Sequence, residues 1–127
     1  MKRNLIAGTI VILVLIALGA FSIPPTKKYL YHLRRAEEVV LQLNLSTMRR
    51  AIDFYAQDKE KMPQSLNELV SAGYLREIPA DPFTKSNQTW VVQREKESSV
   101  PNTPPGIIDV HSGASGADTS GKPYNRY

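Results

Sequence analysis

The residues whose types could support catalysis lie together near the C-terminus. Asp109, His111 and Ser112 are of the kinds found in hydrolytic triads. Such triads are assembled in space from separate elements, so adjacency in the sequence is weak support for catalysis. The chain has no cysteine and two histidines, which excludes a thiolate nucleophile and a multi-histidine metal site. We therefore expect no enzymatic activity.

Two aspartates in the same region could bind calcium. Asp109 and Asp118 bracket a loop rich in glycine and serine, and Ca²⁺ prefers carboxylate and carbonyl oxygens gathered on a flexible loop. The spacing is not that of an EF-hand, and aspartate is also common in exposed turns. The sequence leaves both interpretations open, a calcium site at Asp109 and Asp118 or turn-forming aspartates.

The composition limits the size of the protein and the kinds of partner it can have. The 127 residues are enough for one domain, and Lys and Arg exceed Asp and Glu by 16 to 12. Residues 1–63 contain ten of the basic side chains and five acidic ones. These basic residues flank an apolar run, which favours a membrane surface over a nucleic acid as partner.

The apolar run predicts a helix near the N-terminus. Residues 5–23 contain no charged side chain, and about 20 apolar residues are needed to cross a membrane as a helix. We expect an uncleaved transmembrane anchor over residues 1–25. Two alternatives remain open. One is a cleavable secretory signal, since Lys2 and Arg3 precede the run and small residues lie at Ala17 and Gly19. The other is a buried helix of a soluble protein.

A second, amphipathic helix is expected over residues 26–58, after the interruption at Pro24 and Pro25. Apolar residues recur there at steps of three and four, the spacing of one helix face. We predict that this face is buried in the core. Its members are Leu30, Leu33, Val40, Leu43, Thr47, Ala51 and Tyr55, widened by Val39, Leu41, Met48, Ile52 and Phe54.

A short helix is predicted next. Ser65 and Glu68 form a capping box in which Ser65 accepts a backbone N–H and Glu68 reaches back to Ser65. Leu66, Leu69 and Val70 give this helix an apolar face, and Gly73 suits the left-handed residue that ends a helix. Tyr74, Leu75 and Ile78 are expected to pack back onto the same core.

Two strands are predicted at residues 90–93 and 107–110, separated by an exposed loop over residues 94–106. Residues 112–127 should form a loop, ordered by packing of Tyr124 or Tyr127 or by a bound ion. The expected fold is α+β: a long N-terminal helix, transmembrane and then amphipathic, packed on a small head with a short helix and a small antiparallel sheet.

The sequence also resembles the major, G-type pseudopilins of type II secretion systems, within the type IV pilin-like family. The resemblance is best over residues 35–84 and looser over residues 28–127; Trp90 and residues 106–113 (GIIDVHSG) resemble that family's strands. The motifs that carry it are residues 35–36 (RA), 51–58 (AIDFYAQD), 62–63 (MP), 65–69 (SLNEL), 73–75 (GYL) and 79–83 (PADPF).

The resemblance implies a single-pass protein of the bacterial inner membrane, with residues 26–127 as a periplasmic, pilin-like head. It implies a structural subunit of a type II secretion or type IV pilus-like machine, in contact with other such subunits or with copies of itself in a filament. It also implies calcium in the C-terminal loop, for which Asp109 and Asp118 are the nearest candidates. Family members have a glutamate in the membrane helix where this sequence has Ala7. The alternative is therefore a membrane-anchored periplasmic binding module that does not polymerise, with the apolar helix face or the loop 94–106 as its binding surface.

Overall fold

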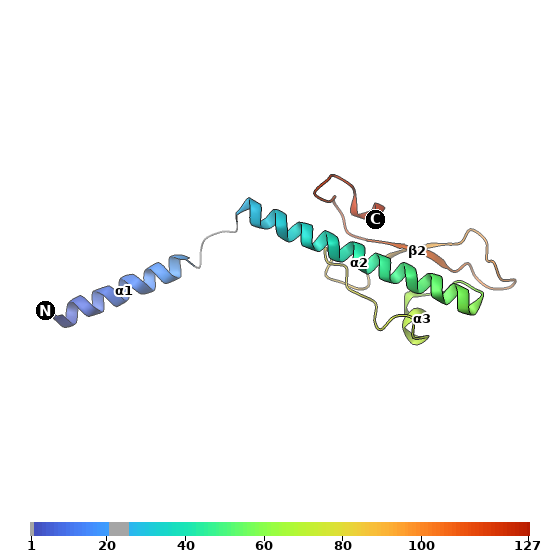
Figure 1. Cartoon of the computed structure of the whole chain (residues 1–127), viewed down its shortest axis with the longest axis horizontal. Coiled ribbons are helices and arrows are strands. Elements are labelled where there is room, and N and C mark those ends of the chain that lie inside the picture. The colour runs from blue at the N-terminus through green and yellow to red at the C-terminus, as the bar shows by residue number, and fades with distance from the viewer. Residues whose placement is uncertain (1, 21–25) are drawn as a thin grey trace. The chain divides into compact units, whose positions relative to one another are not determined.

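The computed structural model describes residues 2–20 and 26–127. The chain divides into two compact units, Met1–Leu30 and Tyr31–Tyr127, and each is described by itself. In the first unit, helix α1 spans Lys2–Ala20 (Figure 1). Over the described ranges, no helix combines the length and the sustained apolarity that crossing a membrane requires. The anchor over residues 1–25 stays a prediction, and the interruption expected at Pro24 and Pro25 lies outside the described residues.

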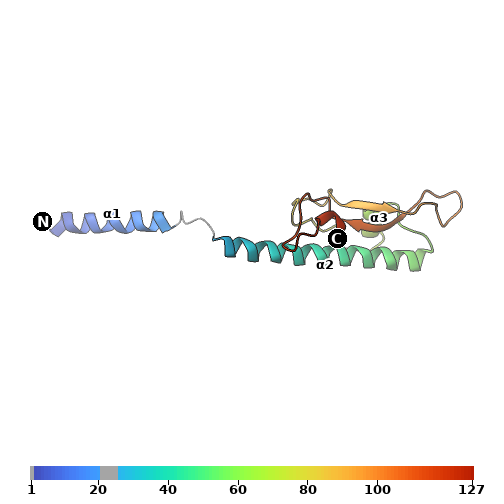
Figure 2. The same cartoon turned by 90° about the horizontal axis from the view of Figure 1, so that it is seen from above.

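Helix α2 spans Lys27–Lys59, within one residue of the predicted bounds. The Thr26 hydroxyl accepts a hydrogen bond from the backbone N–H of Tyr29 at 3.3 Å and so caps the first turn. The helix ends before Glu60, which takes a left-handed backbone with φ of 53°. The strands and helix α3 lie beside the C-terminal half of α2 (Figures 1 and 2).

The core lies on a different face of α2 from the one predicted. Most of the predicted face is exposed, so that part of the prediction is wrong. The exposed members are Leu30, Leu33, Val40, Leu43 and Thr47, with Val39 and Phe54 of the flanking residues. The prediction is confirmed for Ala51 and Tyr55, and for the flanking residues Leu41, Met48 and Ile52. Apolar residues occupy two faces of this helix. The spacing alone does not tell which of the two faces the sheet, α3 and the C-terminal residues cover.

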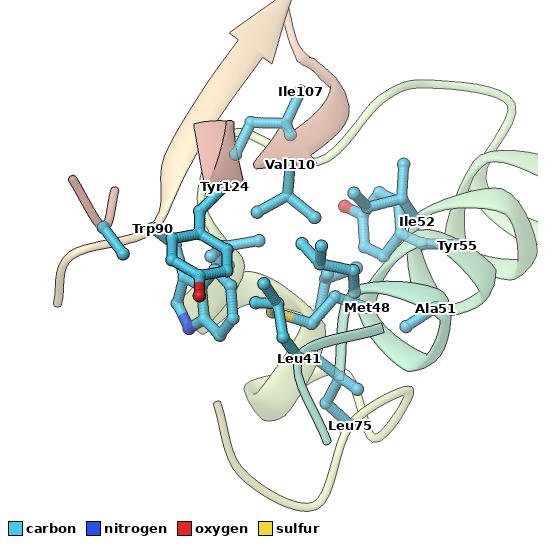
Figure 3. Close-up of a cluster of buried hydrophobic side chains, with 14 residues drawn as sticks. Leu41, Met48, Ala51, Ile52, Tyr55, Leu75, Trp90, Ile107, Val110 and Tyr124 are labelled. Atoms are coloured by element: carbon cyan, nitrogen blue, oxygen red, sulfur yellow. The ribbon is translucent and has the colours of Figure 1, made fainter. Parts of the chain in front are cut away.

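The core joins α2 to the sheet, to α3 and to the C-terminal residues. Figure 3 shows Met48, Ile52 and Val110 pointing toward one another, with the rings of Trp90 and Tyr124 beside them. The members are Leu41, Leu45, Met48, Ala51, Ile52, Tyr55, Leu66, Leu69, Leu75, Trp90, Ile107, Val110, Ala114 and Tyr124. Tyr74 and Ile78 pack against this cluster, as predicted, and both are partly buried.

Helix α3, Leu66–Ser71, begins and ends as its sequence predicts, with one difference at its start. The Ser65 hydroxyl accepts from the Glu68 N–H at 3.2 Å. The Glu68 carboxylate reaches back to the N–H of Gln64, at 2.7 Å, and not to Ser65. Gly73 has φ of 83°, and the N–H groups of Gly73 and Tyr74 bond to the carbonyls of Val70 and Leu69, which completes a Schellman motif. We call residues 60–75 the α3 corner.

The two predicted strands are present. Strand β1, Val91–Arg94, pairs antiparallel with β2, Ile107–His111, and the register shifts between Gln93 and Arg94. Ile107 and Val110 of β2 are buried in the core. The loop between the strands, residues 95–106, was expected to be exposed and to begin at Arg94. Half of its residues are exposed, Gly106 at its end is buried, and Arg94 belongs to β1. The coarse prediction of an α+β fold with a long helix, a short helix and a small antiparallel sheet is confirmed.

The C-terminal segment, residues 112–127, contains the 3₁₀ turn η1, Tyr124–Arg126, and an isolated antiparallel bridge between Ala117 and Pro123. Packing of Tyr124, one of the means of ordering considered above, is present. Tyr124 is 4% exposed, and its ring stacks on the ring of Phe83 with the centroids 4.1 Å apart.

Candidate functional site

Asp109, the first predicted calcium ligand, forms a salt bridge with the side chain of Arg49. Its Oδ1 lies 2.7 Å from Nε of Arg49, and the two side chains are about one-third exposed. Its Oδ2 lies 3.4 Å from Nε2 of His111, two residues along β2. The carboxylate therefore faces a guanidinium on α2 and an imidazole on its own strand.

Arg49 binds three oxygens with its guanidinium. Besides Asp109, it donates from Nη2 to the backbone oxygen of Val110 at 2.9 Å and to that of Tyr127 at 2.7 Å. His111 Nδ1 lies 2.7 Å from the same Tyr127 oxygen. Arg49 thus ties the middle of α2 to β2 and to the last residue of the sequence. Sequence reasoning missed it, since an arginine beside a buried Met48 has no local signature of such a role.

Asp118, the second predicted ligand, accepts four hydrogen bonds from its own loop. Its Oδ1 takes the N–H and the hydroxyl of Ser120, both at 2.7 Å, and the N–H of Lys122 at 2.9 Å. Its Oδ2 accepts from the Tyr127 hydroxyl. The bonds from Tyr127 and Ser120 hold the pKa of Asp118 well below its usual range. The same contact raises the pKa of Tyr127.

The hydrogen-bond donors around Asp109 and Asp118 do not fit a calcium site. Ca²⁺ takes six to eight oxygen ligands, whereas Asp109 and Asp118 are approached by N–H and O–H groups and by a guanidinium. Among the described residues, no group of three or more His, Cys, Asp or Glu side chains is placed to hold a metal ion. Calcium at Asp109 and Asp118 stays a prediction, and the donor chemistry at both residues argues against it.

The candidate catalytic residues have separate partners. The Ser112 hydroxyl donates to Asp81 Oδ2 at 2.5 Å, and both side chains are fully buried. Asp81 also accepts the N–H of Phe83 at 2.8 Å. Asp109 and His111 face each other, but the hydroxyl that would complete a triad is bonded to a different carboxylate. The Asp81–Ser112 pair joins the turn after Pro79 to the end of β2, which is a structural role.

A further buried carboxylate holds the C-terminal segment to α2. Glu38 is 5% exposed and accepts the Thr119 N–H at 2.8 Å and the Thr119 hydroxyl at 3.0 Å. The apolar spacing of α2 does not indicate that Glu38 is buried, because a glutamate on a helix is usually exposed to solvent.

The exposed apolar line of α2 is the other candidate site. Val40, Leu43 and Phe54 follow one another at steps of three and eleven residues and are 45%, 64% and 51% exposed. A shallow groove of about 180 Å³ continues the line at its C-terminal end. The groove is lined by Thr47, Arg50, Ala51, Phe54 and Tyr74. We call Val40, Leu43, Thr47 and Phe54 the α2 stripe.

Comparison of the chain with models of protein families, with curated proteins and with solved structures found no match.

Proposed function

We propose that this chain is a structural, pseudopilin-like subunit of a type II secretion or type IV pilus-like machine. In this proposal the N-terminal apolar run anchors it in the bacterial inner membrane and residues 26–127 form a periplasmic head. The proposal is supported by the motif resemblance and by the order of elements, in which a long helix is followed by a short helix and an antiparallel strand pair.

The observation that carries the proposal is the α2 stripe. Its apolar members lie on a face of α2 that the core does not cover, since the core residues Leu45 and Ile52 lie on the other side. An exposed row of large apolar side chains at helical spacing favours docking of another helix or of an apolar groove. A subunit that packs side by side with its neighbours requires such a surface.

The anchor rests on the sequence of residues 5–23. This run has no charged side chain, and burial of such a segment in lipid is favourable when its backbone is helical. Helix α1 covers most of the run, from Lys2 to Ala20. A head attached in this way would be confined to the membrane surface, where lateral encounters with other subunits are frequent.

The test is site-specific photo-cross-linking of the full chain in membranes of its native host. A photoreactive amino acid in place of Leu43 or Phe54 samples whatever lies against the α2 stripe. The matched control is the same replacement at Asp53, which is exposed on α2 next to Phe54 and off the stripe. We expect both stripe positions, and not Asp53, to give adducts with copies of this chain or with other pilin-like subunits.

Two results would contradict the proposal. Adducts from Leu43 and Phe54 with a single periplasmic protein unrelated to pilins would favour the anchored binding module. Equal yields at Leu43, Phe54 and Asp53 would mean that the stripe has no specific partner.

A further inference from the structure

We propose that Arg49 replaces a bound divalent cation in this protein, so that the C-terminal segment closes on α2 without calcium. The residues involved are Arg49, Asp109, His111, Asp118 and Tyr127, which we call the Arg49 latch. The inference follows from the donors that surround the two aspartates, and it does not depend on the proposed function.

A permanent positive charge already lies beside Asp109. The Arg49 guanidinium lies 2.7 Å from Oδ1 and reaches the carbonyl of Val110 at 2.9 Å and the backbone oxygen of Tyr127 at 2.7 Å. These are one carboxylate oxygen and two backbone oxygens, the same kinds of atom that a hard cation gathers. A guanidinium is permanently charged and donates from several N–H groups at once. A divalent cation brought to these oxygens would meet strong repulsion from Arg49 at short range.

The groups around Asp118 are hydrogen-bond donors. Three donors within 2.9 Å saturate Oδ1, and Oδ2 is bonded to the Tyr127 hydroxyl. A calcium ligand presents free lone pairs toward a common centre. Here the lone pairs are used by N–H and O–H groups of the loop itself, and Lys122 Nζ lies 3.9 Å from the centroid of the Tyr127 ring. A bound cation would have to break several of these bonds.

Tyr127 connects the two halves of the latch. Its backbone oxygen is bonded to Arg49 and lies 2.7 Å from His111 Nδ1, and its hydroxyl is bonded to Asp118. One residue therefore links α2, β2 and the loop around Asp118. An ion that bridged two aspartates would provide the same connection between a strand and the loop that follows it.

The experiment is thermal unfolding of the full chain in detergent, followed by the fluorescence of Trp90. Trp90 is the only tryptophan and is 9% exposed in the core, so its signal reports unfolding of the head. Melting temperatures are compared in EDTA and in calcium at about 10 mM, tenfold above the weakest dissociation constants of about 1 mM for extracellular modules. We expect the wild-type melting temperature to be the same in both.

Arg49→Met is expected to lower the melting temperature by about 5–10 °C, because the guanidinium that donates hydrogen bonds to three oxygens is lost. Arg50→Met is the matched control. Arg50 is the next residue of α2 and is exposed, so we expect its melting temperature to remain near that of the wild type. Tyr127→Phe removes the hydroxyl that bonds to Asp118 and that also interacts with Gln42, while the bonds of Arg49 remain. It should give a smaller decrease, again equal in EDTA and calcium.

Three results would overturn the inference. The first is a wild-type melting temperature at least about 4 °C higher in calcium, the rise expected for a ligand of the folded state at tenfold excess. The second is an Arg49→Met protein with the same melting temperature as Arg50→Met. The third is a Tyr127→Phe protein whose melting temperature is restored by calcium, since this would show a cation taking part in the native loop.

Discussion

Tyrosine–carboxylate hydrogen bonds join α2 to the α3 corner, and another lies within the C-terminal segment. Tyr55 donates to Glu68 at 2.5 Å, and Tyr127 donates to Asp118. In both pairs the hydrogen bond lowers the pKa of the carboxyl group and contributes to a raised pKa of the phenol. The chemistry of the two pairs is thus the same, but their surroundings differ.

The two regions are attached to α2 by different forces. The α3 corner has a helix of its own and attaches through Leu66 and Leu69, which are 9% and 0% exposed. The C-terminal segment has no regular element beyond η1, and it attaches through Tyr124 and through polar contacts of Arg49 and Glu38. A region with its own secondary structure can rely on nonspecific apolar burial, whereas an irregular one needs directional bonds to distant partners.

The largest effect is expected where the C-terminal segment leaves β2. A Cβ on Gly113 would lie 2.0 Å from the carbonyl oxygen of Thr89 and 3.1 Å from its carbonyl carbon. Both neighbours are backbone atoms, so relief requires a shift of the chain. We expect Gly113→Ala to lower the free energy of unfolding by about 3 kcal/mol, measured by denaturant titration with Trp90 fluorescence.

Ser115→Ala is the control for Gly113→Ala. Ser115 is exposed in the same segment, and its replacement should change the free energy of unfolding by no more than about 0.5 kcal/mol. If Gly113→Ala changed the free energy of unfolding as little as this control, the C-terminal segment would be able to move away from Thr89 at little cost. The segment would then not be held to α2 and β2 by specific contacts.

The next effect tests the Tyr55–Glu68 pair, which joins α2 to the α3 corner. Glu68→Ala leaves the Tyr55 hydroxyl, in a residue 3% exposed, without its partner and also frees the N–H of Gln64. A buried polar group without a partner is costly, so we expect a loss of about 2–3 kcal/mol in the free energy of unfolding. Glu77→Ala, at an exposed position, is the control. Equal stability of the two variants would mean that water replaces Glu68 as the partner of Tyr55.

The α3 corner could be predicted from the sequence because its signals are local. Ser65, Glu68 and Gly73 act within a few residues of α3, and the capping and Schellman patterns specify how such residues are used. The strands were also found, since β-branched runs between turn residues leave few alternatives. The error at Glu68, which bonds to Gln64 and not to Ser65, is a shift of one residue within the same motif.

The Arg49 latch could not be predicted, because its members are far apart in the chain. Arg49 and Tyr127 are 78 residues apart, and nothing near either one indicates the other. The choice between the two apolar faces of α2 failed for a similar reason. Leu43 and Leu45 are equally apolar, and only the position of the sheet decides that Leu45 is buried. Asp109 and Asp118 were identified as important residues, but the sequence does not show whether a carboxylate meets a cation or an N–H.

Gly73→Ala should have a smaller effect than Gly113→Ala, for a different reason. A Cβ on Gly73 would meet no atom within 4 Å, but its φ of 83° is strained for residues other than glycine. We expect a loss of about 1–2 kcal/mol in the free energy of unfolding, measured by the same titration. Gly73→Asn should recover part of this loss, because asparagine adopts the left-handed conformation more readily. An asparagine variant less stable than the alanine variant would indicate that space, and not φ, limits this position.

The smallest effect concerns the alkaline stability of the Tyr55–Glu68 pair. Burial and the bond to Glu68 raise the pKa of Tyr55 to about 12, against about 10 for tyrosine in the unfolded chain. A raised pKa favours the neutral phenol in the folded state. The stability it contributes is therefore complete below about pH 10 and is lost as the pH rises from about 10 to 12. Tyr55→Phe removes this dependence and costs about 1 kcal/mol at neutral pH through the lost hydrogen bond.

The wild type should therefore be more stable than Tyr55→Phe up to about pH 10, and this advantage should shrink as the pH approaches about 12. The measurement is the free energy of unfolding of both proteins at several alkaline pH values. Taking the difference cancels the contributions of the other tyrosines, including Tyr127. The same difference measured for Tyr127→Phe gives the comparison between the two regions. The pKa of Tyr127 is also raised, but the Tyr127–Asp118 pair lies in the irregular C-terminal segment. A constant difference between wild type and Tyr55→Phe across this range would mean that the phenol of Tyr55 ionises in the folded protein as it does in the unfolded chain.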